Sequence, residues 1–491
     1  MKWANFLHIY QPANQIDEIF DRVVNESYKP LIKTLKDFPE TKITLNINGA
    51  LSEQFEKRGF DELIKDISFV AERGQIEFTD SAKYHALLPF LGEDEIVRQI
   101  KLNNDTNKRI FGDTYNPKGF FPPEMAYSPT LPKILKNLGY EWMIIDEIAF
   151  NGKINQIDAN NVYKILNDDL FVFFRERSHS NLIMSALVRR EQDFQEILGS
   201  EYRKKGYIVT GMDGETFGHH RPGLQELLTG LLRSRDFEHV FMSELISTFK
   251  NPISVAPITS TWASTELEIE EGKQFLTWKD ETNNIHNLQW QLHELAKKVV
   301  YEESKNEGEA RKKLDKAISS DQFFWASAKP WWSLEVIEAG AWNLLDTVRA
   351  VVGIPKKITT KAEELYYKII GLAFEWQRTG YVRNRYKEYK DRPRIPFKDK
   401  TSKDGEPWIY NAFIELLKDA MIKASKKENF EEAILWRDAI WKLETKNDIF
   451  ESVHAIDILR KQLTNAEILD MIGKYRREYE KLSSGQPEQR S

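Results

Sequence analysis

The feature that most constrains the fold is a series of seven short apolar segments spaced roughly 30 residues apart in the first half of the chain. They cover 2–10, 41–47, 75–79, 118–121, 142–145, 170–174 and a segment that begins at 206. Helical patterns separate most of them, and one strand plus one helix has the length of a βαβ unit. The segments do not repeat in sequence, so the period indicates architecture and not a solenoid. We therefore predict an α/β fold, an incomplete seven-stranded parallel (β/α)7 barrel.

The second half of the chain is predicted to be helical. Apolar residues recur at helical spacing, with few strand signals, over 288–304, 310–319, 334–352 and 361–376. The domains expected from this change of pattern are a catalytic barrel at 1–287, a helical domain completing the cleft at 288–400, a C-terminal helical region at 401–482 and a disordered tail at 483–491.

Charge and cysteine content exclude several classes of protein. The 491 residues carry a net charge of −6, and both signs are interspersed, so no basic stripe indicates nucleic-acid binding. The absence of Cys excludes disulfides and thiolate metal sites and fits a reducing compartment. No long apolar segment follows the N-terminus, so neither a signal peptide nor a membrane span is expected. We expect a cytoplasmic protein without nucleic-acid or membrane partners.

A dense polar cluster, GYIVTGMDGETFGHHRPG, lies at 206–223. The apolar run at its start has the pattern of a buried strand, so Asp213, Glu215, His219 and His220 come just past a strand end. Loops after the strands of a parallel α/β fold carry chemistry. The alternative interpretation is a simple turn in which the Asp-Gly pair only caps the next helix.

A second carboxylate follows another strand in the same way. Glu124 lies in GFFPPEMAYS at 119–128, directly after an aromatic strand. Two acidic residues at the ends of two strands, surrounded by aromatic residues and glycines, meet the requirement of glycoside hydrolysis. The same rim of the barrel is expected to carry the polar residues near other strand ends, which are His8, Glu77, Asp146 and Arg175.

Several of the 13 tryptophans gather in one segment of the helical half. Trp325, Trp331 and Trp332 flank Lys329-Pro330 within 320–343. Proline breaks a helix, so a loop is expected to present the adjacent pair of indoles. Aromatic platforms bind the apolar faces of sugar rings, but interdomain contacts also bury tryptophan. Both interpretations stand on sequence alone.

With these residues in view, the chain resembles glycoside hydrolase family 57, the α-amylase and 4-α-glucanotransferase group, over about residues 3 to 345. The blocks that carry the resemblance, in the family's order, are His8-Ile9-Tyr10-Gln11-Pro12, Gly74 to Thr79, Gly119 to Ser128, Met212 to Gly218, Ser260-Thr261-Trp262 and 320–332. In the first block Tyr10 replaces the family's second His, which puts one sugar contact in question.

The resemblance implies a retaining mechanism on α-glucans, with Glu124 as the nucleophile, Asp213 as the acid/base and no metal or organic cofactor. Glu215 is a second candidate for the acid/base or a helix-capping residue. The residues expected to bind the substrate are His8, Gln11, Glu77, Arg175, His219, Trp262, Trp325, Trp331 and Trp332. The sequence does not separate hydrolysis from transfer to a second sugar.

Two other functions remain open from the residues. A metal-dependent polysaccharide deacetylase uses an Asp and two His on a related barrel, and His219-His220 superficially fits it, although adjacent helical residues point about 100° apart. An inactive glucan-binding protein would lack one of the two carboxylates, and both are present.

A short C-terminal segment resembles a UVR motif, the helical hairpin of bacterial excision-repair nuclease subunits. The matching residues within 421–443 are Met421, Ala424, Phe430, Glu431, Ala433, Arg437, Asp438 and Ile440. We interpret the segment as a hairpin for packing or partner binding, without a nuclease implication.

Overall fold

The strands of the barrel agree closely with the predicted segments. The computed structural model describes residues 1–184, 189–198, 206–303, 308–329, 331–387, 407–445, 463 and 465–483. The seven predicted segments correspond to β1 Lys2–Ile9, β2 Ile43–Ile47, β3 Ile76–Asp80, β4 Gly119–Phe120, β5 Trp142–Asp146, β7 Phe171–Arg175 and β8 Tyr207–Asp213.

These strands form one curled sheet in the order β8-β1-β2-β3-β4-β5-β7, and every pair in that order is parallel. No ladder joins β7 to β8 in the described part of the chain, although Glu176 N donates to Val209 O at 2.8 Å across the gap. The predicted fold class, an incomplete parallel barrel followed by helices, is therefore confirmed.

Three additional strands were not predicted. They are β6 Tyr163–Ile165, β9 Glu238–His239 and β10 Ile253–Val255. β6 is antiparallel to β7, and β9 joins the N-terminal end of β1. Each has only two or three residues, which is too short for a periodic sequence pattern to reveal.

Alternation along the strands separates the barrel interior from the helical layer. Phe6 lies in the inner core with Trp142 and Phe173, whereas Leu7 packs outward against the helices. Gly119 allows this inner packing, because a Cβ there would lie 2.1 Å from the Trp142 ring. The inward row of β1 continues from Phe6 to His8, at the C-terminal end of the strand.

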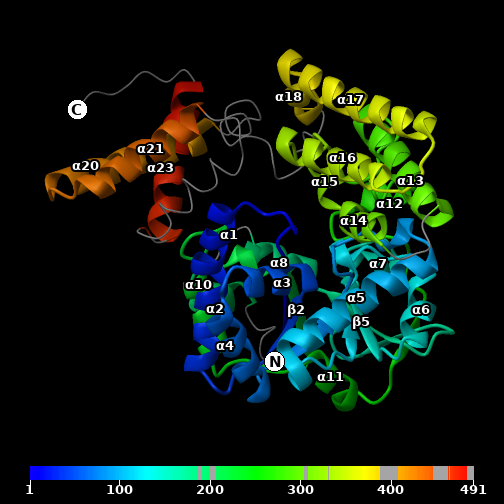
Figure 1. Cartoon of the computed structure of the whole chain (residues 1–491). Helices are drawn as coiled ribbons and strands as arrows, with labels where there is room; N and C mark the ends of the chain where they lie inside the picture. Colours follow the sequence, from blue (N-terminus) through cyan, green and yellow to red (C-terminus); the bar gives the residue numbers. More distant parts are fainter. Residues whose placement is uncertain are drawn as a thin grey trace, which may run out of the picture.

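Helices cover the outside of the sheet (Figure 1). Their bounds are α1 Asp17–Val23, α2 Lys29–Asp37, α3 Gly49–Lys57, α4 Asp61–Glu72, α5 Glu93–Phe111, α6 Leu131–Asn137, α7 Ile148–Asn151, α8 Arg177–Met184, α9 Glu191–Leu198, α10 Gln225–Arg233 and α11 Met242–Thr248.

The helical segment over 17–37 is interrupted. A π-helical turn, Val24–Tyr28, separates α1 from α2. Pro30 has no N–H to donate to the Glu26 carbonyl, so regular α-helical bonding cannot continue through this point. The freed carbonyl points at Gly218, where a Cβ would lie 1.9 Å from the oxygen. The interruption thus fixes the loop after β8 against the first helical layer.

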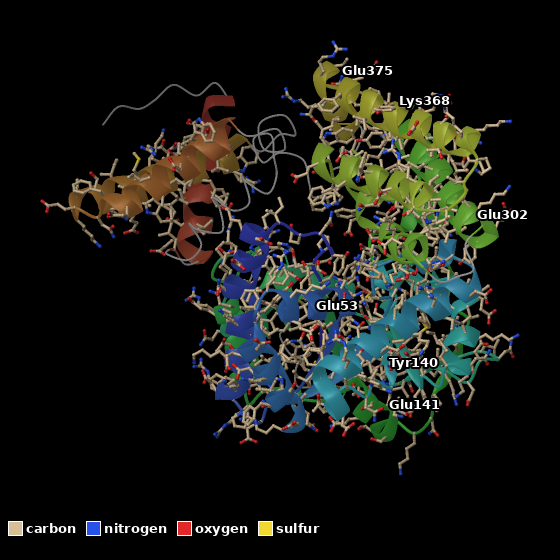
Figure 2. All side chains as sticks on the ribbon, viewed as in Figure 1. Glu53, Tyr140, Glu141, Glu302, Lys368 and Glu375 are labelled. Atoms are coloured by element: carbon tan, nitrogen blue, oxygen red, sulfur yellow. The ribbon has the colours of Figure 1, made fainter. Side chains whose placement is uncertain are left out.

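A second group of helices lies over the C-terminal rim of the barrel (Figure 1). It comprises α12 Glu266–Glu270, α13 Asn284–Glu303, α14 Glu309–Ala317, α15 Asp321–Phe324, α16 Leu334–Arg349, α17 Lys356–Thr379 and α18 Tyr381–Lys387. Helices α13, α14, α16 and α17 share one apolar core. Exposed charged residues such as Glu302, Lys368 and Glu375 project from their outer faces (Figure 2).

Ion pairs connect this helical group to the barrel. Arg311 of α14 contacts Glu95 of α5 at 2.6 Å, and Asp315 contacts Arg98 at 2.7 Å. A bridge pairs Ala86, in the loop after β3, with Ser319. The rim of the barrel and the start of α15 are therefore held in direct contact.

The C-terminal hairpin is present as expected. Helix α20 (Pro407–Lys426) packs against α21 (Phe430–Thr445) around buried Leu417, Trp436 and Ala439, and α23 (Asn465–Ser483) joins them. The predicted boundary at 400 and the tail beyond Ser483 lie outside the described residues. Among the described helices, none is long and apolar enough to cross a bilayer.

Candidate active site

Two carboxylates lie at the C-terminal rim of the barrel. Glu124 follows β4 and has a φ of 61°, a left-handed conformation that a non-glycine residue rarely adopts. Asp213 is the last residue of β8, in register with His8 of β1. Burial, together with the negative charge of Asp213, raises the pKa of Glu124 to about 8. The two carboxylates are thus electrostatically coupled across the site.

Ring nitrogens of Trp262 and His85 lie next to the Glu124 carboxylate. The Trp262 indole N–H donates to Glu124 Oε2 at 2.8 Å, which favours the ionised form and partly offsets the burial. His85 Nδ1 lies 3.8 Å from Glu124 Oε1. Trp262 N also donates to the Glu124 carbonyl at 3.3 Å. The loops after β4 and before α12 therefore fix both the backbone and the side chain of Glu124.

A stack of three rings forms one wall of the site. His85 stacks on Tyr10, with centroids 4.3 Å apart, and on His8 at 5.1 Å. Burial lowers the pKa of His8 to about 4 and lowers that of His85 well below its usual value, so both imidazoles are neutral at pH 7. His85 Nε2 is buried and has no hydrogen-bond partner among the described residues.

The helical group closes the far side of this wall. Tyr10 OH donates to Asp321 Oδ2 at 2.7 Å, and Ser319 Oγ donates to the same oxygen at 2.9 Å. Ser320 Oγ lies 3.0 Å from His85 Nδ1. Two consecutive residues of the helical group thus hold two rings of the barrel rim.

Glu215 is occupied by the N-terminal loop. Its Oε1 accepts from Tyr10 N at 3.1 Å, from Gln11 Nε2 at 3.3 Å and from Tyr28 OH. Burial, with the charge of Asp213, raises its pKa to about 7. These contacts identify Glu215 as the anchor of the loop that carries Tyr10. Gln11, predicted to bind substrate, lies in this anchor.

Arg175 ends β7 at the rim, and protein groups occupy its guanidinium. Its donors contact Gly211 O at 2.6 Å and Asp146 Oδ2 at 2.8 Å, and Asn181 accepts from Nη2. With the contact from Nη2 to Met184 Sδ at 3.5 Å, these acceptors take four of the five N–H donors of Arg175.

Arg177 links Asp146 to the loop that carries Trp262. It pairs with Asp146 Oδ1 at 2.6 Å and donates to Trp262 O at 3.0 Å. The buried aspartate at the end of β5 therefore sets the position of the indole that bonds Glu124.

Two predicted substrate contacts, Glu77 and His219, pair with other protein groups. Glu77 is the second residue of β3, in register with Thr44 and Phe6, and its carboxylate accepts from Ser243 N at 3.4 Å. Its side chain is level with Phe6, one layer of inward-facing side chains below His8. The expectation that Glu77 faces the rim is therefore wrong, because β3 begins only one residue before Glu77. His219 Nδ1 pairs with Glu26 at 2.7 Å.

The three tryptophans of the α15–α16 segment fall into two separate ring clusters. Trp331 stacks on Phe324 at 4.7 Å and meets Trp325 edge to face at 5.6 Å. Trp332 instead stacks on Trp376 of α17, and its N–H donates to Gln377 at 2.6 Å. Because adjacent residues in non-helical backbone point in different directions, the side chains of Trp331 and Trp332 contact different neighbours. Pro330, expected to break a helix here, lies outside the described residues.

Sequence reasoning did not select His85, Asp321 or Arg177. His85 has a φ of 56° in a loop five residues beyond β3, and no periodic signal marks such a position. Asp321 reaches the site through a contact spanning 311 residues. The described residues hold no group of three or more His, Asp or Glu side chains that could bind a metal ion.

The structural class of the protein is a curled parallel barrel covered by helices. Its C-terminal rim carries two electrostatically coupled carboxylates. The profile of glycosyl hydrolase family 57 matches residues 3–256, and the chain belongs to this family. The UvrB/uvrC motif matches residues 411–446, in agreement with the hairpin of α20 and α21.

Curated relatives are similar over part of their length. An α-amylase of Dictyoglomus thermophilum is 33% identical over 144 residues, 29% of this chain and 21% of that protein. A 4-α-glucanotransferase of Thermococcus litoralis is 24% identical over 299 residues, 57% of this chain and 45% of that protein. The chain thus spans less than half the length of these relatives.

A solved structure shares the fold over most of its length. A family 57 branching enzyme of Thermococcus kodakaraensis aligns with a TM-score of 0.59, covering 76% of this chain and 96% of that one at 17% identity. At this identity the likeness establishes the fold alone.

Proposed function

We propose that the protein is a retaining glycoside hydrolase that acts on α-glucans, with Glu124 as the nucleophile and Asp213 as the acid/base. The observation that carries the proposal is the pair of coupled carboxylates at the rim, one of which receives the Trp262 N–H. Family membership and the names of the relatives, α-amylases and 4-α-glucanotransferases, support α-glucans as the substrate.

In the first step, Glu124 attacks the anomeric carbon and the glycosidic C–O bond breaks. Asp213 gives its proton to the leaving oxygen. In the second step, Asp213 takes a proton from water, whose oxygen displaces Glu124 from the anomeric carbon. The configuration is retained because two displacements occur.

The chemistry requires one proton on the carboxylate pair, held by Asp213. The raised pKa of Glu124 supports a pair that binds one proton at neutral pH. Coupled carboxylates titrate as a unit, so this proton can reside on Asp213 when a glycosidic oxygen is there to receive it. The Trp262 N–H favours the ionised form of Glu124 in that state.

Neutral rings suit the binding of sugar hydroxyls. His8 and His85 are uncharged at pH 7, so each ring offers one donor and one acceptor nitrogen. His85 Nε2 has no hydrogen-bond partner among the described residues, and in this proposal it binds a sugar hydroxyl. Trp325 and Trp331 supply the aromatic platform in this proposal.

A second candidate is a 4-α-glucanotransferase on the same site, favoured by the similarity to the Thermococcus litoralis protein. The two reactions differ only in whether water or a sugar hydroxyl resolves the intermediate. The test is a time-resolved product profile of EDTA-treated protein on maltooligosaccharides, with Glu124→Gln alongside. Growth of reducing ends indicates hydrolysis, whereas a ladder of longer chains without that growth indicates transfer. Acetate release from acetylated glycans after metal addition, with glucans untouched, would overturn both.

Replacing Trp262 by Phe is expected to lower kcat/KM about 10- to 100-fold, because a hydrogen bond to a charged group contributes about 1.5–3 kcal/mol. Loss of the N–H also raises the pKa of Glu124 further, so the acidic limb of the kcat/KM profile moves to higher pH. A matched control is Trp278→Phe, since the buried Trp278 N–H has no hydrogen-bond partner in the part of the chain that the structure describes. An unshifted acidic limb in Trp262→Phe contradicts the assigned role.

Trp331→Ala and Trp332→Ala are expected to act differently. Removal of Trp331 raises KM for oligosaccharides about three- to tenfold through loss of a stacking surface. Removal of Trp332 breaks its contacts with Trp376 and Gln377 and costs about 1–3 kcal/mol of stability. Steady-state kinetics and thermal melts of both variants check this. A raised KM with an unchanged melt for Trp332→Ala would reverse the assignment.

A further inference from the structure

We propose that a polar cleft behind Tyr10, between the N-terminal loop and helices α14 and α16, is a binding subsite for neutral α-glucan chain that extends the active site. This inference rests on the proposed function, because it names the part of the same substrate that lies beyond the reacting bond.

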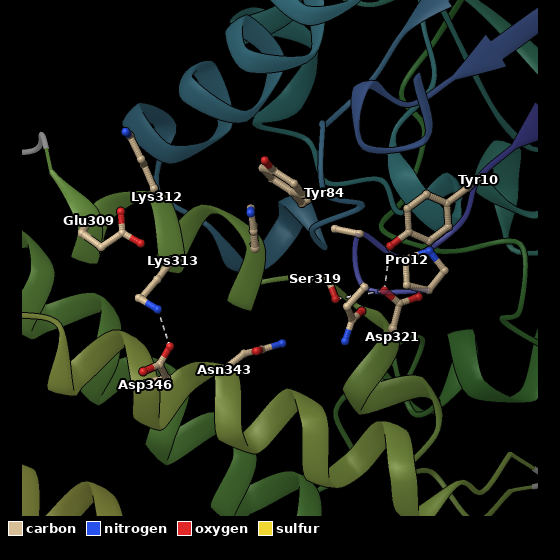
Figure 3. A pocket seen from close by; sticks show the side chains of 13 residues that line it. Tyr10, Pro12, Tyr84, Glu309, Lys312, Lys313, Ser319, Asp321, Asn343 and Asp346 are labelled. Atoms are coloured by element: carbon tan, nitrogen blue, oxygen red, sulfur yellow. Dashed lines mark hydrogen bonds and ion pairs between the residues drawn. The ribbon is translucent and has the colours of Figure 1, made fainter. Parts of the chain in front are cut away.

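The cleft is an elongated cavity of about 390 Å³. Sites for small molecules have volumes of about 300–1,000 Å³. Figure 3 shows Tyr10 and Asp321 at one end and Lys312, Lys313 and Asp346 at the other, with Asn343 and Tyr84 between them. An elongated trough of this kind suits an extended chain of sugar units.

Several polar groups in the cleft have unused hydrogen-bonding capacity. The ammonium groups of Lys312 and Lys316 form no ion pair with the described residues, and the side chain of Asn343 forms no hydrogen bond with them. The Tyr84 hydroxyl is also without a hydrogen bond in the described part of the chain. Donors and acceptors that line one cavity without protein partners are the groups that would receive ligand hydroxyls.

The charge of the cleft favours a neutral ligand. Its three lysines are matched by three carboxylates, those of Glu309, Asp321 and Asp346. Lys313 is already paired with Asp346. An anionic ligand would meet the carboxylates as well as the lysines, whereas hydroxyl groups can accept from the lysines and donate to the carboxylates. A polyhydroxylated chain therefore fits this lining better than a phosphate ester does.

Tyr10 connects the cleft to the carboxylate pair. One face of its ring stacks on His85, which lies 3.8 Å from Glu124, and its hydroxyl donates to Asp321 in the cleft. The Tyr10 side chain thus bridges the reacting centre and the helical group. A glucan bound at Glu124 would pass Tyr10 to enter the cleft.

The test compares Lys316→Met and Asn343→Leu, which keep the size of each side chain but remove its polar head. Lys298→Met is the matched control, because Lys298 lies on the exposed side of α13 outside the cleft. We expect each cleft variant to raise the ratio of KM for maltoheptaose to KM for maltotriose about three- to tenfold, the effect of losing one hydrogen bond. Lys298→Met should leave that ratio as in the wild type.

Calorimetric titration in the Glu124→Gln background separates this proposal from the proposed function. Weaker maltoheptaose binding after adding Lys316→Met supports the subsite even if the wild type shows no turnover. Active wild type with an unchanged KM ratio in both cleft variants overturns the subsite and leaves the proposed function standing. Binding of inorganic phosphate that depends on Lys316, without binding of maltoheptaose, also overturns it.

Discussion

Replacing Glu124 by Gln is expected to lower kcat on maltooligosaccharides by a factor on the order of 10⁴, the scale typical of removing a covalent nucleophile. Gln keeps the shape of the side chain and can still accept from the Trp262 N–H, so the site geometry is preserved. The carboxamide cannot form the glycosyl ester. The comparison requires circular dichroism and a thermal melt to show that the variant is folded.

Asp213→Asn separates the acid/base from the nucleophile. Its loss is expected to cost about 10²–10⁴ in kcat on natural glucans and much less on an aryl glycoside whose leaving group needs no proton. Azide should then rescue Asp213→Ala to give a product of retained configuration, whereas rescue of Glu124→Ala should give the inverted product. These stereochemical outcomes assign the two roles independently of rate.

Near-normal activity of either variant on its preferred glucan would contradict the assignment. Glu215→Gln is the informative comparison, because Glu215 is the nearest alternative in the sequence. Its carboxylate anchors Tyr10 and Gln11, so we expect Glu215→Gln to lower stability and raise KM, with a smaller loss of kcat than Asp213→Asn.

The barrel could be predicted from sequence because each strand is a local signal. Residues of β1 and β5 are apolar on both faces, since one face packs in the barrel and the other against helices. Glu124 and Asp213 could be predicted for a related reason: each ends or follows such a strand. The prediction that Glu77 faces the rim is wrong because Glu77 is the second residue of β3 and not its last.

The rest of the site is built by contacts that have no local pattern. His85 meets Glu124 only because its loop pairs with Ser319 and Ser320 of the helical group. The hydrogen bond between Tyr10 and Asp321 joins residues that are 311 positions apart in the sequence. Such pairs depend on how two layers of the protein pack against each other. The periodicity of apolar residues predicts strands and helices, but it does not predict which distant residues come into contact.

The raised pKa of Glu124 also predicts a cost in stability. The carboxylate has an ordinary pKa of 4.5 when unfolded and about 8 in the folded protein, so between these values the folded state holds more protons than the unfolded state. Stability contributed by the protonated form is complete below pH 4.5 and is lost as the pH rises through about 8. At pH 8 the wild type must keep a nearly buried charge beside Asp213.

Glu124→Gln removes that charge, so the variant is expected to be more stable than the wild type at pH 8 by about 2–4 kcal/mol, with the difference shrinking toward zero near pH 4.5. Chemical denaturation at a series of pH values measures it. Glu302→Gln, at an exposed position of α13, controls for loss of a surface carboxylate. An equal difference at both ends of the range would mean that Glu124 is not held in a destabilising environment. A stability difference between variant and wild type that grows with pH would show that ionisation of Glu124, the proposed nucleophile, destabilises the folded protein.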